Sequence, residues 1–365
     1  MPVKAKLGLA LLLGLFGANA MAADKTAMHL FSWYDYIAPE TPKDFEKESG
    51  TPVLLDTFDS VEVMQSKLMV GRTGYDVAVV SSDALPNLIK AGVLQEIDPA
   101  QLSNYQHLDP ELLAKLAIND PGNRHAVPYL WGTTAIGYDV DKVREVLGDN
   151  APVDSWDLIF KEENAAKLSQ CGLAMLDAAG EIVPIALHYL GLPPNSTNPE
   201  DYRKAEALLS KIRPYVRYFD SSKFITDLAN GNICAVIGWA GGVYDAQVQS
   251  AKANNGRHIA YSIPREGAPV WMDSYVVLKD APHPQQGLEF INYMLRPEVV
   301  AKSSDYIGYA NANRDATAFV SKELRENQGA YPSAETMATL FPVEPLPLKT
   351  ERIRTRLWTK VRTGK

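Results

Sequence analysis

Cysteine is scarce in this chain of 365 residues, which contains only Cys171 and Cys234. Neither lies at a short spacing from another Cys or from a His, so a metal-binding pair or a catalytic Cys is the less favoured interpretation. The default for an even pair in an oxidising compartment is one disulfide. It would close a loop of about 63 residues, and such a crosslink typically stabilises a fold by roughly 2–4 kcal/mol.

Signature motifs of catalysis and of cofactor binding are also missing. The chain has no G-x-x-x-x-G-K-[ST], H-E-x-x-H, EF-hand or G-x-S-x-G pattern. Its six histidines are scattered without ligand spacing, and we interpret them as structural or surface residues. A glycosidase-type carboxylate pair stays open in any acidic protein. We therefore expect no enzyme, no metal and no cofactor.

The chain has no internal repeat, no low-complexity tract and no linker rich in Gly, Ser or Pro. Without its leader it would have about 340 residues, more than one hydrophobic core usually supports. Two closely joined lobes are therefore expected.

The N-terminus begins with two lysines, an apolar stretch from Leu7 to about Gly17, and the small-residue pattern Ala20-Met21-Ala22. This pattern predicts a secretory signal peptide over residues 1–22, whose apolar part is too short for a stable membrane span. No Cys follows for a lipid anchor, so we expect a free, soluble mature protein in a bacterial periplasm. The formal net charge of −8 disfavours nucleic acid as a partner and is compatible with a cationic ligand.

The order of the expected elements indicates an α/β fold. Strand, helix, strand, helix and strand follow one another over residues 27–37, 41–50, 51–58, 61–71 and 75–82. Such an order favours a parallel sheet covered by helices on both faces, with ligands beyond the carboxyl ends of its strands. The strand ends to examine are Trp33–Asp35, Phe58–Ser60 and Ser81–Asp83.

A second α/β region runs from about residue 139 to residue 263. The extended segment 126–140 could cross from one lobe to the other, and segment 259–277 could cross back, which would make a hinge. The expected division is residues 23–134 plus 270–312 for the first lobe and residues 135–269 plus 313–365 for the second.

The strand around WMDSY, residues 271–275, carries an unexpected carboxylate. Alternation along a strand places Trp271 and Asp273 on one face. A ring beside a carboxylate suits an alkyl-ammonium ligand. The alternative is a surface Asp beside a Trp at the edge of the core.

Several stretches carry a family resemblance, namely SWYDYI, FDSVEVMQSKLMVGRTGYDV, APVDSWDLIF, YFDSSKFITDLANGNICAVIGWAGG, FINYMLRPEVVA, YANAN and RTRLWTKVRTGK. Together they resemble the periplasmic polyamine-binding proteins of ABC importers, above all the putrescine-binding branch. The resemblance implies a two-lobed type II periplasmic binding fold and a Cys171–Cys234 bridge. It also implies a monomer that captures a small cationic amine and delivers it to an inner-membrane ABC permease; sequence cannot separate this role from sensing through a membrane receptor.

Carried over position by position, the resemblance implies a set of ligand-binding residues: Trp33, Asp35, Ser82, Glu181, Trp239, Trp271, Asp273 and Tyr309. Asp273 would take an ammonium group, and the aromatic side chains would wall the alkyl chain.

The chain departs from this pattern at several site positions. Gly242 stands where putrescine binders carry an acidic residue, and Tyr34 where they carry a small hydroxyl residue. Trp271 looks like the spermidine branch, but Ala178 stands where that branch has an Asp. A helix N-terminus left uncovered at Gly242 would prefer an anion.

The ligand therefore stays open between three alternatives. A diamine such as putrescine would need Asp35 and Glu181 to compensate for Gly242. An ω-amino acid such as 4-aminobutyrate or 5-aminovalerate would place its carboxylate near Gly241 and Gly242. Agmatine would use the space that the missing side chain vacates.

Overall fold

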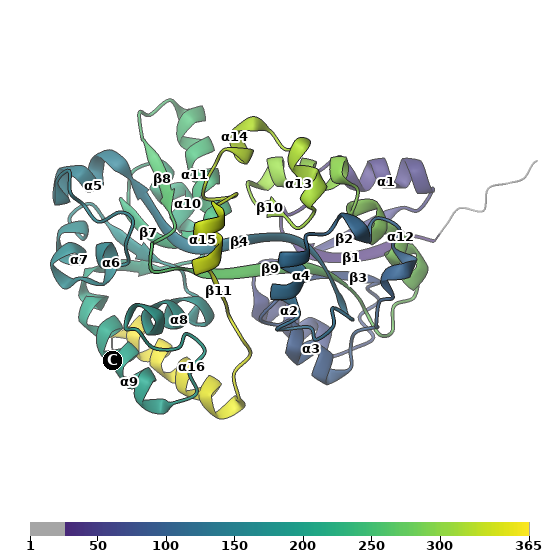
Figure 1. Cartoon of the computed structure of the whole chain (residues 1–365), viewed down its shortest axis with the longest axis horizontal. Coiled ribbons are helices and arrows are strands. Elements are labelled where there is room, and N and C mark those ends of the chain that lie inside the picture. The colour runs from purple at the N-terminus through teal and green to yellow at the C-terminus, as the bar shows by residue number, and fades with distance from the viewer. Residues whose placement is uncertain (1–25, 365) are drawn as a thin grey trace, which may run out of the picture.

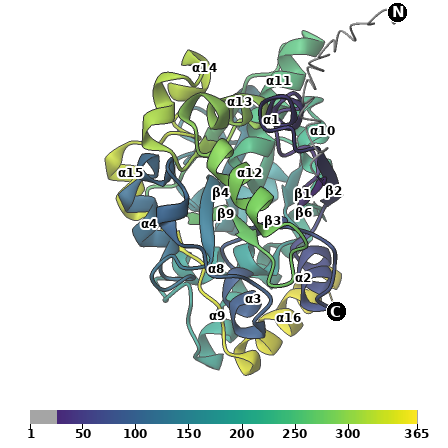
Figure 2. The ribbon, with the colours of Figure 1, turned by 90° about the vertical axis from the view of Figure 1, so that its right-hand side faces the viewer.

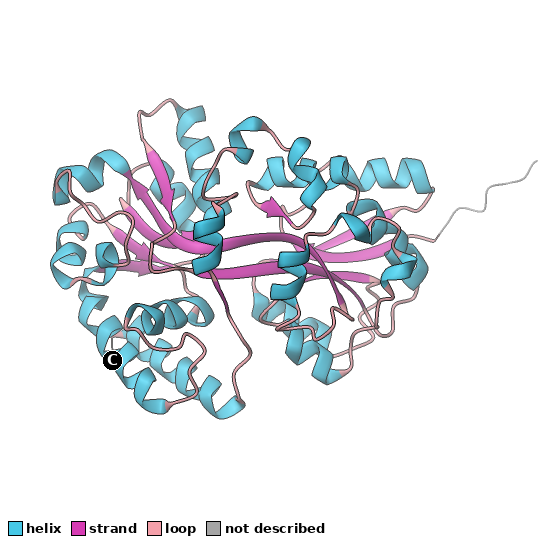
Figure 3. Ribbon diagram, in the orientation of Figure 1, coloured by secondary structure: helices cyan, strands magenta, loops and turns pink. Residues whose placement is uncertain are grey.

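The computed structural model describes residues 26–364 as two groups of strands joined through the middle of one sheet (Figures 1 and 3). The strands are β1 (Met28–Trp33), β2 (Val53–Phe58), β3 (Val77–Ser81), β4 (Ala126–Asp139), β5 (Leu173–Met175), β6 (Val216–Phe219), β7 (Ala235–Trp239), β8 (Ile259–Ser262), β9 (Pro269–Val277), β10 (Ala310–Asn311) and β11 (Phe341–Pro342).

Helices cover this sheet on both sides. The α-helices are α1 (Thr41–Ser49), α2 (Val61–Met69), α3 (Leu85–Ala91), α4 (Pro110–Leu116), α5 (Val140–Leu147), α6 (Asp157–Phe160), α7 (Glu162–Leu168), α8 (Ala179–Tyr189), α9 (Pro199–Ile212), α10 (Lys223–Ala229), α11 (Ala240–Ala253), α12 (Pro284–Met294), α13 (Pro297–Ile307), α14 (Lys322–Arg325), α15 (Ala334–Thr339) and α16 (Leu348–Thr363). Short 3-10 helices are η1 (Pro99–Gln101), η2 (Tyr105–His107), η3 (Arg213–Tyr215) and η4 (Arg314–Ala318). Figure 2 shows α1 and α13 on one side of the sheet and α2 and α3 on the other.

The predicted β-α-β-α-β order at the start of the chain is confirmed. β1 pairs in parallel with both β2 and β3. The strand order is β2-β1-β3-β9-β4-β7-β5-β6, and β9 is antiparallel to β3 and to β4. The sheet is therefore mixed, because β9 returns between two strands from earlier in the chain.

Strand β4 joins the two lobes. Its first half, up to Thr133, pairs with β9, and its second half, from Thr134, pairs with β7 and β8. Nearly all of its residues are buried, as expected for a strand covered on both faces. The change of partners at Thr133 and Thr134 lies within the predicted hinge segment.

The return crossing is interrupted. The sequence suggested strand character over residues 259–277, but residues 263–268 separate β8 from β9. Pro264 lacks the N–H that a ladder needs, and Gly267 has a φ of +104°, which a strand does not accommodate. The chain therefore crosses in an irregular segment.

The C-terminal part of the chain makes a third crossing, which the expected division placed at residue 313. η4 packs on α13 in the first lobe, whereas α16 packs on α8 and α9 in the second. Between them β11 pairs in parallel with Pro269 and Val270 of β9 (Figure 1).

The predicted disulfide is present between Cys171 and Cys234, which are 63 residues apart in the sequence. The predicted signal peptide, residues 1–22, lies outside the described residues. Within residues 26–364, no helix has the length and apolar character required to cross a membrane.

Candidate ligand-binding site

Asp273 lies in the middle of the sheet, opposite Ser81 of β3 and Leu130 of β4. Its side chain is only 5 % exposed, so it is not the surface residue of the alternative interpretation. The hydroxyl of Tyr36 donates a hydrogen bond of 2.5 Å to its Oδ2. No lysine or arginine within the described residues forms an ion pair with this carboxylate.

Burial is the main reason why the pKa of Asp273 is raised to about 7. The negative charges of Asp83 and Glu181 raise this pKa further, while the Tyr36 hydroxyl and the Trp33 indole lower it. The indole Nε1 of Trp33 has no hydrogen bond of normal geometry, although it acts on the carboxylate.

Glu181 stands in the first turn of α8, in the second lobe. The Thr134 hydroxyl donates to its Oε2, and the Trp239 indole N–H lies 2.9 Å and 3.1 Å from the two oxygens. Burial again comes first among the causes that raise its pKa to about 7, and Asp83 adds to the effect. Neutral donors from β4 and β7 therefore orient a second carboxylate that forms no ion pair with any residue the structure describes.

Aromatic rings continue from Asp273 toward the second lobe. The rings of Trp271 and Tyr309 meet edge to face at 4.9 Å. Tyr36 lies 6.1 Å from Tyr309 and 6.5 Å from Trp33 between ring centroids. Such rings can pack against methylene groups and attract a cation to their faces.

The two lobes meet where Tyr309 and its neighbour approach helix α11. A Cβ at Gly241 would overlap the Tyr309 ring, and a Cβ at Gly308 would overlap Tyr244. Gly308 also has a φ of +78°, a conformation that favours glycine. Glycine at both positions lets the aromatic segment of the first lobe lie directly on the second lobe.

Three of the residues expected at the site make their contacts with groups other than Asp273 and Glu181, or are exposed. Tyr34 is 75 % exposed. Asp35, with a φ of +55°, accepts a hydrogen bond of 2.5 Å from Tyr306 and thereby raises the pKa of Tyr306 to about 12. Ser82 bonds the backbone of Met272 through its N–H (2.8 Å) and its Oγ (3.3 Å). In this conformation none of them hydrogen-bonds Asp273 or Glu181.

Gly242 does not form an open end of a helix. It is buried as the third residue of α11, and a Cβ there would overlap the ring of Phe224, with Ile225 close behind. The space that the sequence suggested as vacated is therefore filled by α10. In this conformation a side chain at position 242 would therefore meet the ring of Phe224.

Sequence reasoning did not include Tyr36, Thr134 or Asp83 among the site residues. Tyr36 is in the stretch SWYDYI, three residues after Trp33, and Asp83 is at one of the strand ends noted above. Thr134 lies in the crossing strand β4, and no sequence pattern marks it. Only its hydrogen bond to Glu181 of α8 shows that it belongs to the site.

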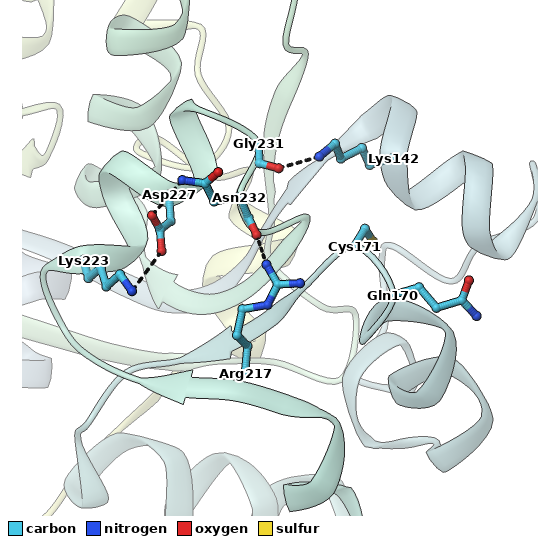
Figure 4. Close-up of a pocket in the computed structure, with 8 residues that line it drawn as sticks. All are labelled: Lys142, Gln170, Cys171, Arg217, Lys223, Asp227, Gly231 and Asn232. Carbon is cyan, nitrogen blue, oxygen red and sulfur yellow. Dashed lines mark hydrogen bonds and ion pairs between the residues drawn. The ribbon is translucent and has the colours of Figure 1, made fainter.

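A separate recess of about 510 Å³ lies in the second lobe beside the disulfide (Figure 4). Lys142, Arg217 and Lys223 line it together with Asp227, and the first two donate to the carbonyls of Gly231 and Asn232. This lining does not suit a cation. Nor does any group of three or more His, Cys, Asp or Glu residues in the described chain form a metal site.

Two lobes joined by crossing strands, with carboxylates and rings from both lobes, suit a solute-binding protein, and the relatives of the chain are binding proteins and not enzymes. The chain belongs to the family described as bacterial extracellular solute-binding protein, whose model matches residues 41–332. It is a periplasmic protein, as are its relatives.

Two curated relatives cover almost the whole chain. A putrescine/agmatine-binding protein of Pseudomonas aeruginosa is 64 % identical over 96 % of both chains. The putrescine-binding periplasmic protein PotF of Escherichia coli is 51 % identical over 95 % of this chain and 94 % of its own. Among solved structures, the spermidine/putrescine ABC transporter substrate-binding protein PotD of Streptococcus pneumoniae superposes with a TM-score of 0.80 at 28 % identity, covering 93 % of this chain and 99 % of its own.

Proposed function

We propose that this protein binds a polyamine of the putrescine type between its lobes and delivers it to an inner-membrane ABC permease. The observation that carries the proposal is the pair Asp273 and Glu181, one buried and one partly buried carboxylate, which within the described residues receive hydrogen bonds from neutral groups and form no ion pair. Uncompensated buried charge is costly, so such a pair favours a ligand that brings positive charge. The names of the relatives support the same ligand class.

In the proposed complex an ammonium group binds Asp273, and the rings of Trp33, Trp239, Trp271 and Tyr309 contact the methylene chain. A cation–π contact contributes about 0.5–2 kcal/mol, whereas breaking a buried charge pair costs about 2–5 kcal/mol. The carboxylates therefore dominate affinity, and the rings select an alkyl chain of suitable length.

An ω-amino acid is not favoured. Its carboxylate would lie near Glu181 and Asp83, whose negative charges already raise the pKa of Asp273. The space beside Gly242, which the sequence suggested for a ligand group, is occupied by the ring of Phe224. Agmatine is dicationic, as putrescine is, and belongs among the ligands to be tested.

We further propose that binding closes a hinge at residues 133–137 and 262–269 in a monomeric protein. The first lobe would contain residues 23–134 and 270–312, and the second residues 135–269 and the C-terminal helix. Packing of η4 on α13, together with the hydrogen bond from the Ser321 N–H to Asp305 of α13, argues that residues 313–321 also move with the first lobe.

The proposal is tested by thermal shift of ligand-stripped mature protein with putrescine, cadaverine, spermidine, agmatine, 4-aminobutyrate and 5-aminovalerate. A ligand at a hundred times its dissociation constant adds about 2.7 kcal/mol of stability, which gives a measurable shift. We expect shifts with the diamines or agmatine and none with the amino acids. Stabilisation by the amino acids alone would refute the proposal.

A further inference from the structure

Asp83 is near enough to the two site carboxylates for its charge to act on both, although it belongs to a third element. It is the third residue of the turn from Ser81 to Ala84, which the Ala84 N–H closes on the Ser81 carbonyl at 3.1 Å. Ser81 pairs directly with Asp273. The adjoining backbone bond between Ser82 and Met272 fixes this turn against β9, so the turn holds Asp83 close to the Asp273 end of the site.

The Asp83 carboxylate is exposed and acts on both site carboxylates. Its negative charge raises the pKa of Glu181 and that of Asp273. Within residues 26–364 it forms no hydrogen bond and no ion pair of its own. It is therefore available to a cationic group of a ligand.

A buried hydroxyl at the same edge of the site also lacks a partner. Ser81 is 7 % exposed, and no group in the described chain hydrogen-bonds its Oγ. Residues that lie directly opposite each other in an antiparallel pair share a face of the sheet, so this Oγ is on the same face as the Asp273 side chain. A carboxylate and an unused hydroxyl acceptor together suit an ammonium or a guanidinium, which have several N–H donors and no acceptor.

Resting on the proposed function, we infer that Asp83 binds the second cationic group of a dicationic ligand whose other ammonium is held by Asp273 and Glu181. Position 242 cannot provide this charge, because Gly242 has no side chain and Phe224 fills the adjoining space. The carboxylate of the second subsite thus comes from the first lobe, from the turn after β3. The second group is either an ammonium or a guanidinium, since both match the chemistry.

The test is titration calorimetry of putrescine, agmatine and 1-aminobutane with the wild-type protein and with Asp83→Asn. 1-Aminobutane has the chain length of putrescine but only one charge. We expect Asp83→Asn to weaken putrescine or agmatine about 10- to 100-fold and to leave 1-aminobutane within about twofold. A loss confined to agmatine identifies the guanidinium as the group at Asp83, and a loss with putrescine identifies an ammonium.

The matched control is Asp59→Asn, which removes one exposed carboxylate just after β2, at the same end of the parallel strands. Equal weakening by the two variants, or equal weakening of 1-aminobutane and putrescine, would overturn the role of Asp83 and leave the proposed function intact. Wild-type protein that binds none of the amines would overturn both. Recovery of affinity in Asp83→Glu would support a direct charge contact.

Discussion

The two carboxylates of the site come from different lobes but have similar surroundings. Asp273 receives a hydrogen bond from the Tyr36 hydroxyl and is influenced by the Trp33 indole; Glu181 receives one from the Thr134 hydroxyl and others from the Trp239 indole. They differ in backbone: Asp273 is on a central strand and almost fully buried, whereas Glu181 is in the first turn of a helix and only partly buried.

Within the described residues, both carboxylates are held by neutral donors and neither forms an ion pair with a lysine or an arginine. The site is therefore suited to a ligand that supplies the positive charge. Burial raises the pKa of both carboxyls to about 7, and neutral donors only partly oppose that rise. The ionised forms therefore gain most from a ligand that supplies positive charge. The deeper carboxylate should gain more, since its desolvation is more complete.

The largest effect is expected for Asp273→Asn, which keeps the shape of the side chain and removes its charge. We expect affinity for the amine ligand to fall by about 2–5 kcal/mol, because an ammonium would then lie beside a buried neutral amide. Titration calorimetry at pH 8 measures this loss, with Asp59→Asn as the exposed control. An unchanged dissociation constant would remove Asp273 from the site.

Glu181→Gln should have a smaller effect, about 1.5–3 kcal/mol, the range for hydrogen bonds to charged groups. The helix turn that carries residue 181 is partly accessible to water, which screens the lost charge. The same titration compares the two variants directly. If Glu181→Gln lost more affinity than Asp273→Asn, the degree of burial would not explain how much each carboxylate contributes to binding.

Affinity should depend on pH in a defined direction. Both carboxyls have a pKa of about 7 in the ligand-free protein, and the amine binds their ionised forms. Below pH 7 binding must expel protons, so affinity should fall by up to about tenfold per pH unit for each carboxyl, and it should level off above pH 8. Calorimetry in buffers of different ionisation enthalpy counts the released protons. Asp273→Asn should release one proton fewer at pH 6; an unaltered count would contradict the assignment.

The smallest effects are expected when the hydroxyl groups that donate to the two carboxylates are removed. Tyr36→Phe and Thr134→Val each remove one hydrogen bond to an ionised carboxylate, so each should raise the pKa of that carboxyl and weaken amine binding by about 0.5–1.5 kcal/mol. The midpoint of the affinity–pH profile should move upward in both variants. Movement in only one of them would show that the two surroundings are not equivalent.

Much of the fold could be predicted from local pattern. Alternation placed Trp271 and Asp273 on one face of a strand, and the element order gave parallel pairing of β1 with β2 and β3. The disulfide followed from an even pair of cysteines in a secreted chain. The expected division at residue 313 implied a third crossing, but its strand β11 could not be predicted, since a two-residue strand leaves no periodic signal.

The surroundings of the site residues were less accessible to sequence reasoning. Asp35 was expected at the ligand, and the sequence did not indicate that in this conformation its carboxylate accepts a hydrogen bond from Tyr306. Gly242 suggested an open helix end, yet the neighbouring helix supplies Phe224 to fill the space. Each outcome depends on what packs against the residue and not on the residue itself.

The sequence by itself determined the secreted α/β class, the β-α-β-α-β order at the start of the described chain, the pairing of the cysteines and the candidacy of Asp273, because each follows from local periodicity, composition or a short motif. Only the tertiary structure decided that Tyr36 bonds Asp273 across 237 residues of chain, that Thr134 and Trp239 converge on Glu181, and that Asp83 acts on both carboxylates. The physical reason is that burial and electrostatic interaction depend on distance in space, which the pairing of remote strands sets.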